Sequence, residues 1–387
     1  MALLLFTFFV WEQHTLGDFG SVAMNKRIFK NQTTDKGDVP FFKISTFGKK
    51  ADSFISNNLF EKYKEKYPYP QKGDLLISAS GSIGRIVEYK GQKAYYQDSN
   101  IVWLNHNKEL LNIYLKAYYQ IIHWHGIEGS TIKRLYNKNI LATSIFVPDK
   151  KEQYELGKLI KKAEKIISLQ QRKLELLRTL KSGLSYKLFN KKHLNNLIQI
   201  SLDQIGQTYS GLTGKSKKDF GHGHAFYVSY LNVNQNEIGN PKQIDRIEID
   251  KKQNLVQKND IFFTISSETP EEVGLTSLWP VSCENLYLNS FCFGFRISTD
   301  MFIPLYLGYL FRSEYFREKV FPLAQGISRY NLSKNNVLKI KIGQEEIAIQ
   351  EKYARIMNDL DSGILRQKKK VKELKLCKKF LLQNMFI

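Results

Sequence analysis

The chain has little of what covalent cross-links require. Its three cysteines, Cys283, Cys292 and Cys377, form no C-x-x-C pair, and one is left over however the other two combine. We therefore do not expect a disulfide framework, and we expect the protein to be in a reducing compartment. The apolar opening run at 1–10 is shorter than the about 20 residues that cross a bilayer, and no small-residue cleavage site follows it. We expect a buried first strand or an added leader before Trp11 rather than a secretory signal.

Catalytic and cofactor motifs are also missing. The segment GLTGKS at 211–216 resembles a phosphate-binding loop, but Tyr209 stands where that loop needs its first glycine. The histidine pairs at 123–125 and 222–224 have no carboxylate or cysteine beside them at metal-ligand spacing. No Asn-Pro-Pro-Tyr-like site, Gly-rich cofactor loop or identifiable nucleophile set is present. We therefore expect no catalytic residue, no metal and no cofactor.

Positive charge and aromatic side chains are abundant. The 387 residues include 58 Lys plus Arg against 37 Asp plus Glu, a formal charge of +21, and 13% are aromatic. This excess favours a polyanionic partner, with nucleic acid ahead of an anionic membrane surface or a merely solubilising surface. The apolar content of 42% excludes general disorder. The chain is long enough for two or three cores of about 100 to 200 residues each.

The chain repeats itself once. LGDFG aligns with LDQIG, and GDLLI with NDIFF, at a shift of 186 residues that grows to 191 and then to 197. The aligned pairs include Leu16 and Leu202, Gly20 and Gly206, Asp74 and Asp260, Ser99 and Ser290, Leu135 and Leu332, Gln153 and Gln350, Phe189 and Phe386. Two similar surfaces in one chain suit the reading of a two-part target.

Each repeat combines a mixed domain with a long helix. Short apolar and β-branched runs bounded by Gly, Asp and Pro predict strands, with a helix at roughly 109–124, whereas the stretches near 152–188 and 345–386 are helical in pattern. We predict an α+β fold with two similar mixed α/β domains, joined and followed by long helices that form an antiparallel coiled coil. The predicted parts are a leader at 1–10, a first domain at 11–148, a helix at 149–195, a second domain at 196–343 and a helix at 344–387.

Both helical stretches carry a heptad seam. Apolar residues recur alternately four and three apart from Leu156 to Leu188 and from Tyr353 to Met385. The seams are interrupted by polar residues at equivalent places: Gln170 with Gln367, and Lys181 with Lys378. Matched interruptions indicate that the helices pack on each other and that a buried polar pair sets the register. Each helix would be about 55 Å long, more than one turn of B-DNA at about 34 Å.

The order of these segments resembles a known family. Trp11-Glu12-Gln13 with LGDFG, then GDLLISASGSIGRI, YYQDSNIVWL and GSTIKRLYNKNIL before the first helix, are similar to the specificity subunit of a type I restriction-modification system. The resemblance runs from Trp11 to nearly the end of the chain. Two departures are the apolar leader and the stretch TISSETPEEVG, which stands in the second domain where the first has SGSIG.

The resemblance implies a DNA reader without catalytic activity. Each domain would be a target-recognition domain for one half of a split double-stranded DNA sequence, and the coiled coil would be the spacer. The implied partners are modification (methyltransferase) subunits, two of them, and a restriction (motor-nuclease) subunit, in the cytoplasm and without a membrane. Two alternatives stay open: a basic scaffold that reads no sequence, and a DNA-cleaving enzyme, for which no metal or nucleophile constellation is found.

Candidate DNA contacts fall in loops rich in small, hydroxyl or basic residues. Ser80, Ser82 and Arg85 surround a glycine-rich turn that could approach phosphates, although a plain hairpin explains it equally well and a KH-type GxxG loop weakly. Hydroxyl and basic residues recur before each long helix, where an Arg could contact phosphate or read a guanine edge. Two further basic clusters lie near each other in the repeat. These candidates are Lys133 and Arg134, Ser328 and Arg329, Lys26, Arg27 and Lys30, and Lys215, Lys217 and Lys218.

Overall fold

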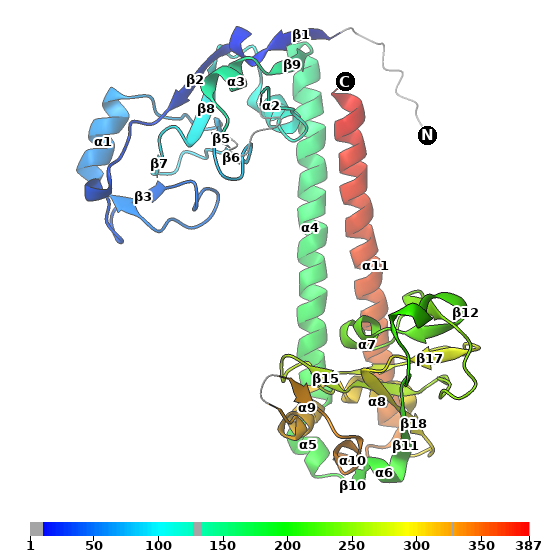
Figure 1. The fold of residues 1–387 in the computed structure, drawn as a ribbon. Helices are drawn as coiled ribbons and strands as arrows, with labels where there is room; N and C mark the ends of the chain where they lie inside the picture. The colour runs from blue at the N-terminus through cyan, green and yellow to red at the C-terminus, as the bar shows by residue number, and fades with distance from the viewer. Residues whose placement is uncertain (1–10, 127–133, 327–328, 387) are drawn as a thin grey trace. The chain divides into compact units, whose positions relative to one another are not determined.

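The structure, a computed structural model, describes residues 11–126, 134–326 and 329–386. The leader expected at 1–10 lies outside these residues. The chain divides into two compact units, one made of the residues up to Gln171 together with those from Lys369, the other of Arg172–Lys368. Both long helices, α4 (Lys150–Leu188) and α11 (Ile347–Met385), contribute a segment to each unit (Figure 1).

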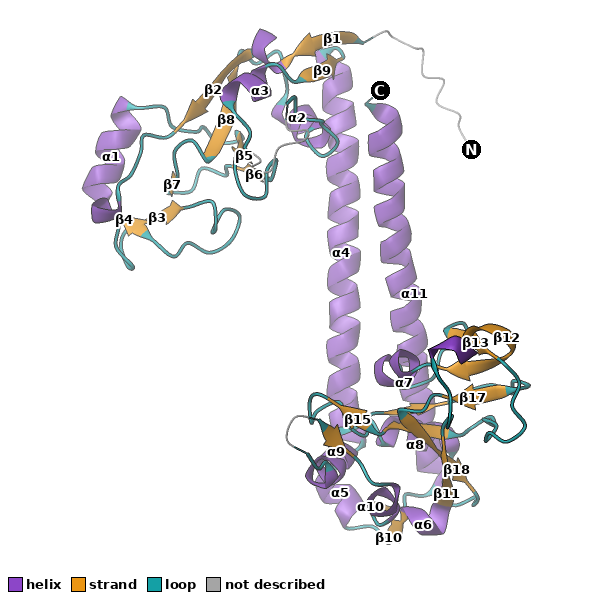
Figure 2. Cartoon of the chain, in the orientation of Figure 1, coloured by secondary structure: helices purple, strands orange, loops and turns teal. Residues whose placement is uncertain are grey.

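The domain of the first unit is built on two small sheets (Figure 2). Its four-stranded sheet is antiparallel, and its three-stranded sheet contains one parallel pair. The sheets are, in strand order, β2 (Gly20–Met24), β8 (Ile101–His106), β5 (Leu75–Ser78) and β6 (Ile86–Glu88); and β4 (Phe54–Ile55), β3 (Val39–Phe42) and β7 (Tyr95–Tyr96). The other elements are β1 (Glu12–Thr15) paired with β9 (Ser144–Val147), and helices α1 (Asn57–Lys66), α2 (Asn112–Tyr118) and α3 (Asn137–Leu141).

The second unit repeats both sheets and the β1–β9 ladder of the first, and its described residues form one further ladder. Its sheets are β11 (Gly206–Ser210), β18 (Cys292–Ile297), β14 (Ile261–Thr264) and β16 (Thr276–Leu278); and β13 (Ile244–Ile247), β12 (Phe220–Val228) and β17 (Leu286–Leu288). Two ladders follow, β10 (Gln199–Ser201) with β20 (Lys341–Gly343) and β15 (Ser266–Ser267) with β19 (Tyr330–Asn331). The helices are α5 (Lys191–Asn195), α6 (Leu202–Ile205), α7 (Tyr230–Gln235), α8 (Pro304–Leu310), α9 (Glu314–Val320) and α10 (Lys334–Leu338). The predicted fold class, with its internal repeat, is confirmed.

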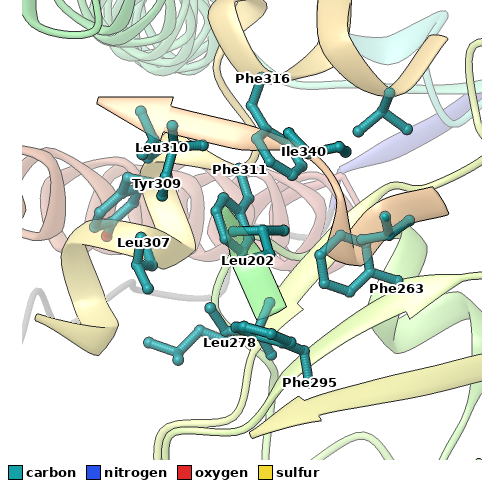
Figure 3. Packing of buried hydrophobic residues seen from close by; sticks show 14 of the residues in the cluster. Leu202, Phe263, Leu278, Phe295, Leu307, Tyr309, Leu310, Phe311, Phe316 and Ile340 are labelled. Carbon is teal, nitrogen blue, oxygen red and sulfur yellow. The ribbon is translucent and has the colours of Figure 1, made fainter. Parts of the chain in front are cut away.

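Aromatic packing fills the core of the second domain. Phe263 on β14 stacks on Phe293 with ring centroids 5.0 Å apart, and Phe311 stacks on Phe316 at 4.2 Å. Figure 3 shows Phe263, Phe311 and Phe316 of this core together with aliphatic residues of α6, α8 and β16, namely Leu202, Leu307, Leu310 and Leu278. Stacked aromatic pairs add to the burial of large apolar areas, so the sheet and its helices are held as one body.

The two long helices run antiparallel in each unit. In the first unit Lys378 donates to Glu164 at 2.7 Å, and in the second Lys181 donates to Asp361 at 2.6 Å. One ion pair maps onto the other under the shift of 197 found in the sequence. Every residue of both predicted seams is buried or half-buried, as expected for an antiparallel coiled coil.

A buried glutamine joins each domain to the long helix that follows it. Gln153 of α4 accepts the backbone N–H of Leu111 at 2.8 Å and donates to the carbonyls of Glu109 and Pro148. Gln350 of α11 makes the equivalent set, accepting from Ile303 at 2.8 Å and donating to two carbonyls. Both glutamine side chains are almost fully buried. Their amide oxygen and nitrogen atoms, which bond the backbone, are therefore shielded from water.

Replacement of Gln153 by Met should lower the free energy of unfolding by about 2 to 4 kcal/mol, because three buried backbone groups lose their partner while the volume stays similar. Gln350→Met should behave alike, and Gln383→Met, at an exposed position of α11, is the matched control. Urea unfolding followed by circular dichroism measures the difference. A Gln153→Met variant within about 0.5 kcal/mol of the control would contradict a structural role for this amide.

Candidate nucleic-acid interface

Three loops converge at the end of the central strand in each domain. In the first domain, the Ala79 N–H donates to the Asn100 carbonyl and the Ala79 carbonyl accepts from the Leu135 N–H, both at 2.8 Å. In the second, Ile265 makes the same two bonds, to Phe291 and from Leu332, both at 2.9 Å. We call these places the first loop cluster (described residues 80–85, 98–100 and 134–136) and the second loop cluster (266–272, 289–291 and 329–331).

The glycine-rich turn of the first loop cluster is a tight hairpin between β5 and β6. Gly84 has φ +76°, and an added Cβ would meet Trp124 Nε1 at 2.7 Å, so only glycine fits there. Ser80 is half-buried and its hydroxyl donates to Asn100, whereas Ser82 is exposed. Arg85 is exposed but donates to the Phe47 carbonyl at 2.9 Å. The structure therefore leaves Ser82 and part of Arg85 able to meet a ligand.

Arg134 is positioned by two contacts within the first loop cluster. Its Nη2 donates to the Ser99 carbonyl at 3.1 Å, and its guanidinium lies 5.9 Å from the ring centroid of Tyr136. Tyr136 is 56% exposed, so the stacked pair faces solvent. Beside it is a hollow of about 660 Å³, whose lining includes Ser99, Arg134, Tyr136, Met24 and Lys138. The other candidate of this segment, Lys133, lies outside the described residues.

The second loop cluster holds its arginine in a similar way. The Arg329 guanidinium lies 5.7 Å from the ring centroid of Phe291, which is 52% exposed. A guanidinium stacked on an aromatic face keeps its N–H donors, which point outward in the guanidinium plane, free for carboxylate, phosphate or base acceptors. Ser328, predicted next to it, lies outside the described residues.

The two further basic clusters differ in how their charges are used. Lys26 lies over the Tyr67 ring, Arg27 over the Phe29 ring, and both, with Lys30, are exposed. Lys215 is half-buried and forms an ion pair with Asp250 at 2.7 Å.

The Lys215 hydrogen bond, helped by the N–H of Lys252, lowers the pKa of Asp250 to about 2, so this carboxylate neutralises Lys215 near neutral pH. Lys217 and Lys218 are exposed. Of this predicted cluster, the structure leaves those two lysines available to phosphates.

The polar seam residues lie within the helix pair. Lys181, 16% exposed, bonds both Asp361 and Glu237, and the Tyr309 hydroxyl also donates to Asp361. Lys378 bonds Glu164 alone among the described residues. Gln367 is buried and Gln170 half-buried, and their facing each other stays a prediction.

Sequence reasoning missed the aromatic supports of the two arginines. Tyr136, two residues after Arg134, could have been found as a nearby exposed ring in a basic segment. Phe291 lies 38 residues before Arg329 and is brought there only by the pairing around β14. Among the described residues no group of three or more His, Cys, Asp or Glu side chains could hold a metal ion. Nor does any helix in that part of the chain have the length and apolarity needed to cross a membrane.

Comparison with known proteins bears on the first domain and on the fold. Residues 10–179 match the family of the type I restriction modification DNA specificity domain. A protein of Haemophilus influenzae named as a type I restriction enzyme specificity subunit is 55% identical over 150 residues, 38% of this chain. That match spans 39% of the relative's length.

Two solved structures share the fold along nearly the whole chain. The S subunit of a type I restriction-modification system from M. genitalium has a TM-score of 0.60 and 18% identity, over 100% of this chain and 98% of its own. A chain solved in work on complex assembly and conformational transition of the type I R-M system has a TM-score of 0.57 and 12% identity, over 97% of each chain. The resemblance stated from the sequence is confirmed for residues 10–179, and the rest of the chain shares the fold of these structures.

Replacement of Lys181 by Met should destabilise the second unit by about 1 to 3 kcal/mol, because two partly buried carboxylates, Glu237 and Asp361, lose their common cation. Lys378→Met, which strands a single carboxylate, should cost less. Adding Glu237→Gln and Asp361→Asn to Lys181→Met should recover part of the loss. Thermal unfolding of the variants at low and high salt provides the measurement, and equal losses for the two lysines would argue against this reading of the charges.

Proposed function

We propose, on the premise that residues 10–179 form a type I restriction modification DNA specificity domain, that the chain reads a bipartite double-stranded DNA sequence. Each domain would read one half with its loop cluster. The observation that carries the proposal is the duplication itself: the same three loops meet at the same backbone bonds, and each cluster presents an arginine on an exposed ring. Such a guanidinium suits contact with phosphate or with guanine O6 and N7.

In this proposal the chain has no catalytic site or cofactor of its own. Methyl transfer and DNA cleavage would belong to partner modification and restriction subunits, acting in the cytoplasm. Two modification subunits are proposed because each unit offers a copy of the same domain and helix surface. The formal charge of +21 would supply the sequence-independent part of the affinity for DNA.

Binding to DNA should fall steeply with salt and should retain a preferred sequence above the non-specific background. Arg134→Ala should cost about 1 to 3 kcal/mol: if Arg134 reads a base, preference should relax at one position of one half only, and if it contacts phosphate, all sequences should weaken alike. Arg178→Ala, on an exposed face of α4, is the matched control. The measurement is a titration of DNA variants across both halves with the reconstituted complex.

An alternative function as a basic scaffold predicts weak salt dependence and no preferred sequence. That outcome for the unchanged chain would refute the proposal. An Arg134→Ala variant indistinguishable from Arg178→Ala would remove Arg134 from the interface while leaving DNA reading intact.

The proposed role of the helices is to set the gap between the two halves of the target. Inserting one heptad in each helix, between Leu174 and Leu177 and between Ile364 and Gln367, keeps the seam in phase. These two stretches lie level because Lys181 pairs with Asp361. The insertion lengthens the pair by about 10 Å, or about three base pairs at about 3.4 Å each.

Selection of bound sites from a random DNA pool should then return the same half-sequences with a longer gap. An insertion in one helix alone is the control, because it leaves the partner short and should impair folding or binding. Recovery of the original gap from a folded double insertion would exclude the helices as the spacer.

A further inference from the structure

The second loop cluster contains an acidic stretch where the first has its glycine-rich hairpin. Residues 268–272 include three carboxylates, Glu268, Glu271 and Glu272, all exposed. A carboxylate near DNA is repelled by phosphates, so its presence at a DNA-reading surface calls for a specific partner. Glu272 already accepts from the Ser267 hydroxyl at 2.8 Å. Glu268 forms no hydrogen bond or ion pair among the described residues.

The ladder β15–β19 brings Glu268 beside the arginine of this cluster. Ser266 pairs with Asn331 and Ser267 with Tyr330, where the ladder ends. Glu268 and Arg329 are the next residues on the two strands, so the same register extended by one residue would oppose them. Directly opposed residues project from the same face of an antiparallel pair, with Cβ atoms about 4.5 to 5.5 Å apart. Asn331, two residues after Arg329, exchanges backbone bonds with Gln325 at 3.0 and 2.8 Å. Both side chains are exposed, and no ion pair joins them in the part of the chain described.

The chemistry of this pair matches one base pair. On the major-groove edge of a G·C pair, guanine offers the O6 and N7 acceptors that a guanidinium bonds, and cytosine offers the N4 amino donor that a carboxylate accepts. The major groove also admits a two-stranded β-ribbon, and Glu268 and Arg329 directly flank the β15–β19 ladder. The Phe291 ring covers one face of the Arg329 guanidinium. The N–H donors at the edge of the guanidinium therefore stay available to the base.

We propose that Glu268 and Arg329 together read one G·C pair in the half of the target bound by the second domain, Glu268 at cytosine N4 and Arg329 at guanine O6 and N7. This inference rests on the proposed function. The first loop cluster has Ser80 and Ser82 in place of the carboxylates, so the two halves of the target would be read by different chemistry.

Selection from a random DNA pool by the full chain in its complex with modification subunits first identifies the two halves. Glu268→Gln should then lower the preference for G·C at one position of one half by about tenfold or more. Arg329→Ala should relax the same position, and the double variant should lose little beyond the single ones, because both side chains address one base pair. Glu271→Gln is the matched control, since its carboxylate lies in the same loop, is exposed and forms no hydrogen bond or ion pair among the described residues.

The outcomes separate this inference from the function on which it rests. If the unchanged chain selects no sequence, the proposed function fails and the inference with it. If it selects a bipartite site but Glu268→Gln alters no position, or strengthens binding to all sequences alike, only the inference is overturned. Effects of the two variants at different positions would also overturn it. The unaltered other half of the site shows in each case that the variant is folded.

Discussion

The amide of Gln153, with its repeat Gln350, is the interaction on which the placement of each loop cluster depends. The side chain bonds the backbone that enters α2 or α8, and these helices pack against the sheet whose central strand ends at the cluster. An apolar residue would fill the space but would leave three backbone groups without a partner. The two N–H donors and the oxygen acceptor of each glutamine amide bond backbone groups in fixed directions. These bonds therefore define one orientation and one axial position of the domain on its helix.

Aromatic contacts at the far ends of the helices complete this attachment in each unit. Phe386, near the end of α11, packs on Tyr114 and Tyr118 of α2, and Phe189 of the other unit packs on Tyr306 of α8. Each domain is thus held by the start of one long helix and the end of the other. The antiparallel direction of the helix pair follows from this arrangement as much as from the seam.

The frame was readable from the sequence because it depends on short-range periodicity and on repetition. The heptad seams, the strand-bounding glycines and the correspondence of Gln153 with Gln350 all appear as local patterns or as copies at a shift that grows in two steps. The candidate interface was only partly readable. The pairing of Lys215 with Asp250, 35 residues away, is tertiary, and so is the support of Arg329 by Phe291. No local sequence pattern predicts which loops pack together at the end of a strand. A lysine that forms an ion pair with a distant carboxylate therefore cannot be told in the sequence from one that forms none.

Under the proposed function, the contrast between the two loop clusters is a division of labour between attracting DNA and discriminating its sequence. Exposed lysines attract any DNA and contribute a salt-dependent affinity that is blind to sequence. Discrimination needs side chains whose bonds are lost on the wrong base, and a carboxylate is well suited because a misplaced one is left desolvated and unpaired. A chain with a charge of +21 can tolerate the local repulsion of Glu268, since the excess of cations offsets it. The bonds of Ala79 and Ile265 that join the three loops are made by the backbone alone. The exposed side chains of the loops can therefore differ between the two domains while the fold stays the same.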